Sequence, residues 1–148
     1  MSVLSAFLNP VSVAEEKEVV ISNRFVKRDE KGKVLVDEAG KPIPQPFKIR
    51  TLTQEVNEMI GRKCRKTVVV NGVPQERVDD AEYGRQVVLA AVVEPDFSDA
   101  ELCMQLGVVD PSLAPGKLLL AGEYTKLQHE IMQFSGFGSM SLEEQAKN

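Results

Sequence analysis

The chain has 148 residues, of which 43% are hydrophobic and 27% are charged. These proportions are typical of a soluble globular protein with one core, and they exclude a disordered chain. The formal net charge of −4 argues against a nucleic-acid-binding protein, because phosphate binding normally requires an excess of Lys and Arg. At this length the chain predicts a single domain over residues 1–148.

The N-terminal part of this domain, over residues 18–78, is predicted to be rich in β-structure. Residues 2–8 precede it and place apolar side chains at helical spacing, which predicts a short amphipathic turn. β-branched residues at positions 19–26 predict a first strand. The hydrophilic, proline-rich stretch over residues 27–46 predicts an exposed hairpin at a sheet edge. The alternation at residues 47–50 predicts a half-buried strand, and no internal repeat is apparent anywhere in the chain.

One helix and one tight hairpin are predicted at the end of this β-rich part. Thr51 and Gln54 have the spacing of a capping box, which predicts a helix near residues 52–64. The dipeptide Asn71-Gly72 lies between two β-branched runs. Because both residues tolerate positive φ, the pair predicts a type I′ turn between two strands.

The C-terminal part, over residues 79–136, is predicted to be helical. Asp79 and Asp80 can cap a helix over residues 81–93. Periodicity cannot separate a buried helix from a buried strand in the apolar run 87–93, but the Asp cap and an Ala pair favour a helix. Further helices are predicted from a capping box at Ser98 to Gly107, over residues 111–120 and over residues 122–134, followed by a polar tail over residues 138–148. Strands come first along the chain and helices follow. This order predicts an α+β fold, with a small N-terminal antiparallel sheet and hairpins followed by a C-terminal cluster of about four helices.

The last predicted helix carries an apolar seam, whose residues recur at alternating spacings of four and three. Packing inside the core is the simpler explanation of such a seam. A helix close to a polar tail can also dock against a partner protein. The candidate partner-binding residues are Tyr124, Leu127, Ile131, Phe134 and Phe137.

A second candidate surface is the basic cluster of Arg62, Lys63, Arg65 and Lys66. Cations at the C-terminal end of a helix complement its dipole, so the cluster needs no ligand to explain it. An acidic partner is the alternative. Nucleic acid is the weaker choice, because no aromatic residues are interleaved with the cations to stack on bases.

The residues that usually carry catalysis or bind metal are scarce. The single histidine, His129, is predicted to lie off the apolar face of its helix, without a nucleophile or an orienting carboxylate nearby. Cys64 and Cys103 are far apart and form no CxxC pair, which predicts two reduced thiols. No phosphate-binding glycine motif occurs. We therefore expect no catalytic residue, no cofactor and no metal site, and hence no enzyme.

Targeting signals are also not apparent. The first ten residues carry neither a basic region nor a long apolar stretch, so we expect no signal peptide. No run of 18 apolar residues occurs, so we expect no membrane span. These features predict a protein of the cytoplasm.

The order of several segments resembles the XkdN-like phage tail assembly chaperones, which myophage-type prophages of Gram-positive bacteria encode. The similarity extends over nearly the whole chain and lies in the order and spacing of its parts. The stretch between residues 27 and 45 is longer than the usual hairpin of the family. The segments that carry the resemblance include Ser5-Ala6-Phe7-Leu8, Ser22-Asn23-Arg24-Phe25, Pro46-Phe47-Lys48-Ile49, Pro95-Asp96-Phe97, Asp99-Ala100-Glu101-Leu102, Gly122-Glu123-Tyr124 and Gly136-Phe137.

The resemblance implies a function without catalysis. Such chaperones bind the long, aggregation-prone tape measure protein while tail tube subunits polymerise around it, so the tail tube protein is a second expected partner. They act in the cytoplasm of the bacterial host and are not expected in the mature virion. Many exist in two forms, of which the longer arises by ribosomal frameshifting.

Two other functions remain open at this point. The chain could be a structural component of the virion, such as a small connector or baseplate protein. It could also be a small nucleic-acid-binding regulator that uses the basic cluster. The sequence predicts neither the oligomeric state nor the stoichiometry with a partner.

Overall fold

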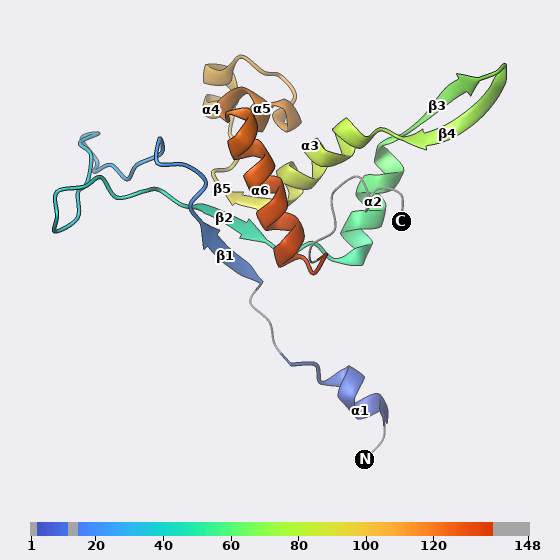
Figure 1. Cartoon of the computed structure of the whole chain (residues 1–148), viewed down its shortest axis with the longest axis horizontal. Helices are drawn as coiled ribbons and strands as arrows, with labels where there is room; N and C mark the ends of the chain where they lie inside the picture. Colours follow the sequence, from blue (N-terminus) through green and yellow to red (C-terminus); the bar gives the residue numbers. More distant parts are fainter. Residues whose placement is uncertain (1–2, 12–14, 138–148) are drawn as a thin grey trace.

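Two antiparallel sheets and a group of helices make up residues 3–11 and 15–137, the part of the chain that the computed structural model describes (Figure 1). The predicted polar tail over residues 138–148 lies outside this part. In chain order the elements are α1 (Val3–Leu8), β1 (Glu16–Val19), β2 (Phe47–Arg50), α2 (Gln54–Lys63), β3 (Arg65–Val70), β4 (Val73–Val78), α3 (Asp80–Ala91), β5 (Val92–Glu94), α4 (Ala100–Leu106), the 3-10 turn η1 (Pro111–Leu113), α5 (Ala114–Leu118) and α6 (Ala121–Phe134).

The larger sheet takes strands from both halves of the chain. Its order is β1-β2-β5, and both pairings are antiparallel, with Val19 opposite Phe47 and Ile49 opposite Val92. The mixture of strands and helices agrees with the predicted class. The predicted separation of an N-terminal sheet from a C-terminal helical cluster is wrong, because the apolar run 87–93 divides: α3 ends at Ala91 and β5 begins at Val92.

The core lies between this sheet and helices α3 and α6. Helix α6 contacts β2, and α3 contacts α2, α6 and η1. Seven core side chains have no exposed surface, and all are aliphatic. They are Ile49, Val87, Val88, Ala91, Ala114, Leu127 and Ile131.

The stretch between β1 and β2 forms a three-armed loop over residues 25–45, and not the predicted hairpin. Three backbone hydrogen bonds close a ring at its centre: Lys27 N donates to Ile43 O, Ile43 N to Leu35 O, and Leu35 N to Lys27 O. Two arms end in equivalent turns, in which one carboxylate oxygen of Asp29 or of Asp37 accepts two backbone N–H groups.

The two turns of the three-armed loop correspond to a short sequence repeat, although no internal repeat was predicted. The pattern Asp-Glu-x-Gly-Lys occurs at residues 29–33 and again at residues 37–41. The glycines, Gly32 and Gly40, have φ values of 83° and 79°, which other residues rarely adopt. A period of eight residues with only two copies is too short to resemble the repeats of known repeat folds.

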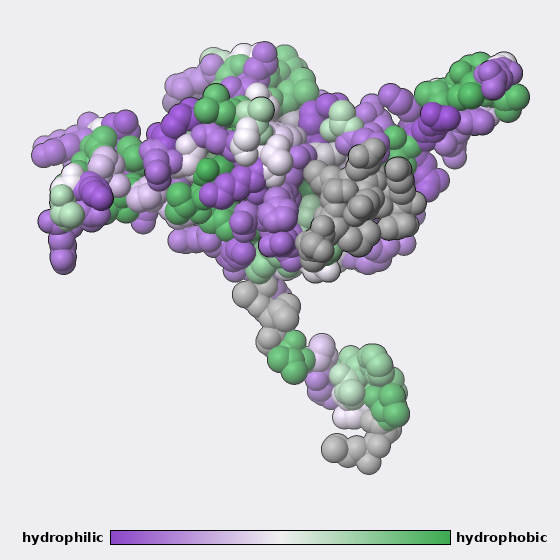
Figure 2. All heavy atoms as spheres, in the orientation of Figure 1, coloured by the Kyte–Doolittle hydropathy of each residue, from purple (hydrophilic) through white to green (hydrophobic). Residues whose placement is uncertain are grey.

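The β3–β4 hairpin projects from the body, with its turn at Asn71 and Gly72 (Figure 1). Both turn residues have positive φ, as the sequence predicted. Figure 2 shows apolar surface at its tip, where Val69 and Val73 are more than half exposed.

Several local predictions are confirmed and others are displaced by a few residues. Asp79 caps α3, and Gly107 ends α4 in the left-handed conformation, as predicted. The caps of α2 and α4 are Thr53 and Asp99, two residues and one residue after the predicted Thr51 and Ser98. The predicted first strand over residues 19–26 is also misplaced, because β1 ends at Val19.

Candidate partner-binding surfaces

The predicted seam of α6 belongs largely to the core. Leu127 and Ile131 have no exposed surface, and Tyr124, Phe134 and Phe137 are half-buried against the core. In this conformation a partner can touch only the outer edges of the last three side chains. The spacing of four and three thus marks the face of α6 that packs against β2 and α3, in agreement with the simpler explanation of the seam. Contact of Leu127 and Ile131 with a partner stays a prediction.

A groove lies beside the seam, between α3, α5 and α6. Its volume is about 560 Å³. Four of its eleven lining residues are Ala or Gly. Gln128 on α6 approaches α3 closely there, since a Cβ added at Gly84 would lie 2.8 Å from Gln128 Nε2. Tyr124 lines the groove, and burial raises the pKa of its hydroxyl. The groove is also lined by Ala81, Gly84, Gly116, Ala121 and Gln128.

A second, more apolar pocket of about 370 Å³ lies where the three-armed loop joins the sheet. Phe25 and Phe47 form one wall, with ring centroids 5.7 Å apart in an edge-to-face arrangement. Pro95, Leu102 and Leu118 complete it. The pocket can hold one or two apolar side chains. Its walls come from five separate segments of the chain, so no local sequence pattern indicates it.

Helix α1 is the most exposed apolar element of the described residues. Its four large side chains, Val3, Leu4, Phe7 and Leu8, are 61–79% exposed. None of its residues is buried, and it stands away from the body in Figure 1. An isolated helix of six residues is not stable in water on its own. Helix α1 therefore needs a contact to be stable, and its exposed apolar side chains are suited to binding a partner.

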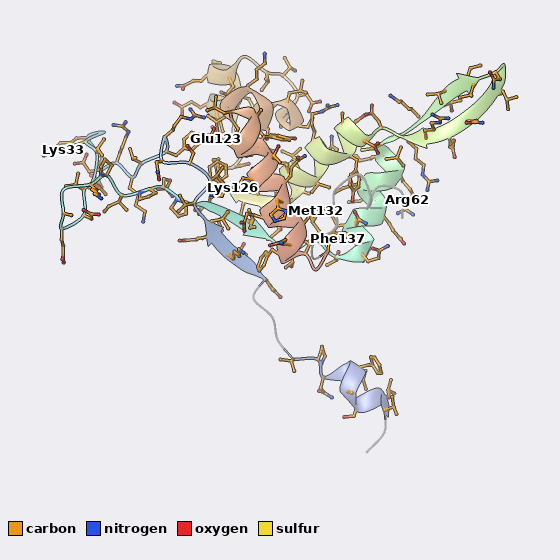
Figure 3. All side chains as sticks on the ribbon, in the orientation of Figure 1. Lys33, Arg62, Glu123, Lys126, Met132 and Phe137 are labelled. Atoms are coloured by element: carbon orange, nitrogen blue, oxygen red, sulfur yellow. The ribbon has the colours of Figure 1, made fainter. Side chains whose placement is uncertain are left out.

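The basic cluster is exposed, as a binding surface requires. Arg62 and Lys63 end α2, and Arg65 and Lys66 begin β3, so the cluster lies where the helix meets the hairpin. Figure 3 labels Arg62 at this position. Lys66 Nζ lies 3.3 Å from Asp79 Oδ2. The pKa of Asp79 is lowered, first by the backbone N–H of Glu82 at the start of α3 and then by Lys66.

An ion pair fastens the root of the three-armed loop to the start of α6. Arg24 donates two hydrogen bonds to the carboxylate of Glu123 and a third to Leu118 O. Glu123 also accepts from Leu120 N at 2.8 Å. These donors hold the pKa of Glu123 at about 2, with Arg24 as the main cause, followed by Ser22 and Leu120.

This pair predicts a loss of stability in acid. A carboxyl whose pKa is lowered by folding contributes fully above its unfolded value of 4.5, and the contribution disappears as the pH falls towards 2. We expect the free energy of unfolding of the native chain to fall more steeply than that of Glu123→Gln between about pH 5 and pH 2. Urea unfolding at a series of pH values measures the free energy of unfolding of the native chain and of Glu123→Gln. A constant difference between the two proteins over this range would contradict the assignment, and Arg24→Ala should behave like Glu123→Gln.

The residues weighed for catalysis lie apart. His129 is exposed on α6, and both cysteines are free and buried. Burial also raises the pKa of Cys64, which keeps this thiol protonated. Within residues 3–11 and 15–137 no three His, Cys, Asp or Glu side chains are grouped so as to hold a metal ion. None of the helices in those ranges combines the length and apolarity that crossing a membrane requires.

Comparison with known families decides between the open functions. Residues 4–147 match the family of phage XkdN-like tail assembly chaperone proteins. The chain belongs to this family. The match confirms the resemblance found in the sequence, and it includes the three-armed loop and the stretch that contains the basic cluster. The chain is thus a phage tail assembly chaperone, with a component of the phage tail as its partner.

The fold of this chaperone also has a counterpart among solved structures. The crystal structure of the protein YqbN superposes with a TM-score of 0.62, covering 89% of this chain and 95% of YqbN. The two sequences are 21% identical, so the similarity concerns the fold. No curated protein matches the sequence.

Proposed function

We propose that this chaperone binds the tape measure protein of its phage, without catalysis, in the cytoplasm of the bacterial host, and that it leaves before the virion is complete. Membership of the tail assembly chaperones supports the tail as the place of action. The observation that carries the finer proposal is the exposed apolar surface of α1, formed by Val3, Leu4, Phe7 and Leu8.

The chemistry of this surface suits a helical partner with an apolar stripe. The sequence from Val3 to Val11 carries no charged residue, so its contacts would be apolar and would tolerate different registers along a long helix. Burying one such side chain contributes roughly 1.5–3 kcal/mol. Four of them can offset the cost of association. Because α1 lies away from the acidic body of the protein, it can bind an apolar surface of the partner while the body remains in solvent.

Co-expression with the tape measure protein tests this proposal. We expect the native chain to keep the tape measure protein soluble and to co-purify with it. Phe7→Asp combined with Leu8→Asp places two charges on α1 and should reduce the captured amount at least tenfold. The fold should survive, because neither side chain contacts the core.

A matched control is Val109→Asp, since Val109 is fully exposed but lies on the loop after α4. It should leave capture unchanged. Equal capture by the α1 variant and the native chain would exclude α1 as the contact. Failure of the native chain to capture the tape measure protein would exclude the proposed partner, and a parallel trial with the tail tube protein would then identify the alternative. Mass spectrometry of purified particles tests whether the chaperone is absent from the virion.

A further inference from the structure

The β3–β4 hairpin is a sheet of two strands in which no side chain is fully buried. Within residues 3–11 and 15–137 no third strand pairs with it. It projects from the body in Figure 1, and Figure 2 shows apolar surface near its tip. A sheet of two strands is only marginally stable in water, and a further strand stabilises it. The outer edges of the hairpin are therefore candidate sites for another strand.

The turn of the hairpin determines which backbone groups lie on each outer edge. In a hairpin with a two-residue turn, the residues that flank the turn form a hydrogen-bonded pair, and such pairs alternate along the two strands. Val70 and Val73 flank the turn. At the base of the hairpin, Asp79 N donates to Cys64 O at 2.8 Å, which agrees with this alternation. The residues of β3 whose N–H and C=O groups point away from β4 are therefore Arg65, Thr67 and Val69.

The two outer edges differ in their capacity to pair with another strand. Pro74 is the cross-strand neighbour of Val69, so its nitrogen faces the outer edge of β4 and offers no N–H there. Proline at such a position protects an edge strand from pairing. Strand β3 contains no proline, and its residues 67–70 are all β-branched, which favours a strand. The outer edge of β3 is therefore the one that is open to a further strand.

Strand β3 is complementary to a second copy of itself in one antiparallel register. If Thr67 lies opposite Thr67 of the second copy, Arg65 lies opposite Val69, and the outward N–H and C=O groups of all three residues meet those of the other copy. Two threonines form a favourable cross-strand pair. The aliphatic stem of Arg65 can cover Val69, which is 71% exposed in the single chain. This register therefore satisfies both the backbone and the side chains of the open edge.

The charges of β3 favour the antiparallel arrangement over a parallel one. Arg65 and Lys66 begin the strand, so a parallel pair would place the cations of the two copies side by side. In the antiparallel register, Arg65 faces Val69 and Lys66 faces Val68. The two copies of Arg65 are then four residues apart along the strands, which is about 14 Å. Because the hairpin projects from the body, the two bodies lie at opposite ends of the pair (Figure 1).

We propose that two copies of this chain associate through the outer edges of β3, with a two-fold axis at Thr67. They form a four-stranded antiparallel sheet of the order β4-β3-β3-β4. Pro74 lies on both outer edges of this sheet, which disfavours the addition of further strands, so the assembly stops at a dimer. The contact uses neither α1 nor the groove beside α6, and both surfaces remain available to another protein.

Sedimentation velocity of the full-length chain tests this association. We expect the mean mass to rise from 16.3 kDa towards twice this value between about 1 μM and about 1 mM, the range for a small interface. Thr67→Lys should raise the dissociation constant at least about tenfold, because it places two cations opposite each other at the axis. In the single chain the new lysine faces its cross-strand neighbour Glu76, so the hairpin should keep its fold. Gln75→Lys is the matched control, since it adds the same charge to an exposed residue of β4, and it should leave the dissociation constant unchanged.

Disulfide formation tests the register of the two strands. Thr67→Cys should give a covalent dimer under mild oxidation, because Cα atoms in a hydrogen-bonded antiparallel pair are about 5.5 Å apart, within the range of a disulfide. Glu76→Cys is the matched control on the same face of the hairpin. Its two copies would lie three strand spacings apart, about 14 Å, so it should not form this dimer. The native chain, whose two cysteines are buried, gives the background.

Three results would overturn the proposal. One is a native chain that stays at 16.3 kDa up to about 1 mM, which would leave the open edge of β3 to a strand of another protein. The second is a dimer that Thr67→Lys does not weaken. The third is as much covalent dimer from Glu76→Cys as from Thr67→Cys. Both experiments use the isolated chain, so their results do not depend on whether the tape measure protein is the partner.

Discussion

Replacing Leu127 by alanine should lower the free energy of unfolding by about 2–5 kcal/mol, the range for deleting a buried leucine. Leu127 has no exposed surface and lies on the face of α6 that packs against the core. The loss combines the transfer of three heavy atoms with the cavity that remains, because neighbours such as Val88 and Ile131 lie in a dense core that relaxes only partly. Denaturant unfolding followed by circular dichroism measures the change.

The control for this change is Lys126→Ala, one residue earlier on the same helix and exposed. It should alter stability by less than about 0.5 kcal/mol. The comparison also decides the role of the seam. If Leu127→Ala kept full stability but lost tape measure capture, the seam would be a binding surface after all, and the packing described above would be wrong.

The elements that the sequence predicted well depend on local chemistry. The turn at Asn71 and Gly72 requires two residues that tolerate positive φ, and only this dipeptide between β-branched runs offers them. Asp79 and Gly107 likewise mark the ends of helices by their own hydrogen-bonding and conformational properties. Such turns and helix ends are determined by four or five neighbouring residues, so they can be predicted without knowledge of tertiary contacts.

The elements that the sequence did not predict depend on distant partners. β5 is three residues long and directly continues α3, so it is a strand only because β2 lies beside it. The three-armed loop has no regular strand, and its ring of hydrogen bonds joins residues 8 and 16 positions apart. Neither hydrophobic periodicity nor a turn motif reports such contacts.

The candidate binding surfaces also differ in whether local sequence or distant contacts determine them. The sequence predicted a basic cluster at Arg62, Lys63, Arg65 and Lys66, and the structure leaves all four residues exposed. The burial of Leu127 could not be separated from binding, because an a/d-like seam is the same pattern in a core and in an interface. The sequence predicted a short amphipathic turn at residues 2–8. Only the structure shows that its apolar side chains lack cover.

Phe97→Ala should destabilise the chain by about 3–5 kcal/mol, the range for removing a buried aromatic side chain. Phe97 is 2% exposed and follows β5, and its ring centroid lies 6.4 Å from that of Phe47 on β2. Its carbonyl oxygen accepts a hydrogen bond from Cys103 Sγ, so the residue ties the sheet to α4. We therefore expect α4 to loosen along with the sheet, which hydrogen exchange of its amides would report.

A double-mutant cycle separates the ring contact from burial alone. Phe97→Leu should cost much less than Phe97→Ala, because it keeps most of the apolar volume. Combined with Phe47→Leu, it should reveal a coupling of about 0.5–1.5 kcal/mol, as expected for a tilted aromatic pair. A Phe97→Ala chain that unfolds within about 1 kcal/mol of the native one would show that the junction of β5 and α4 is held elsewhere.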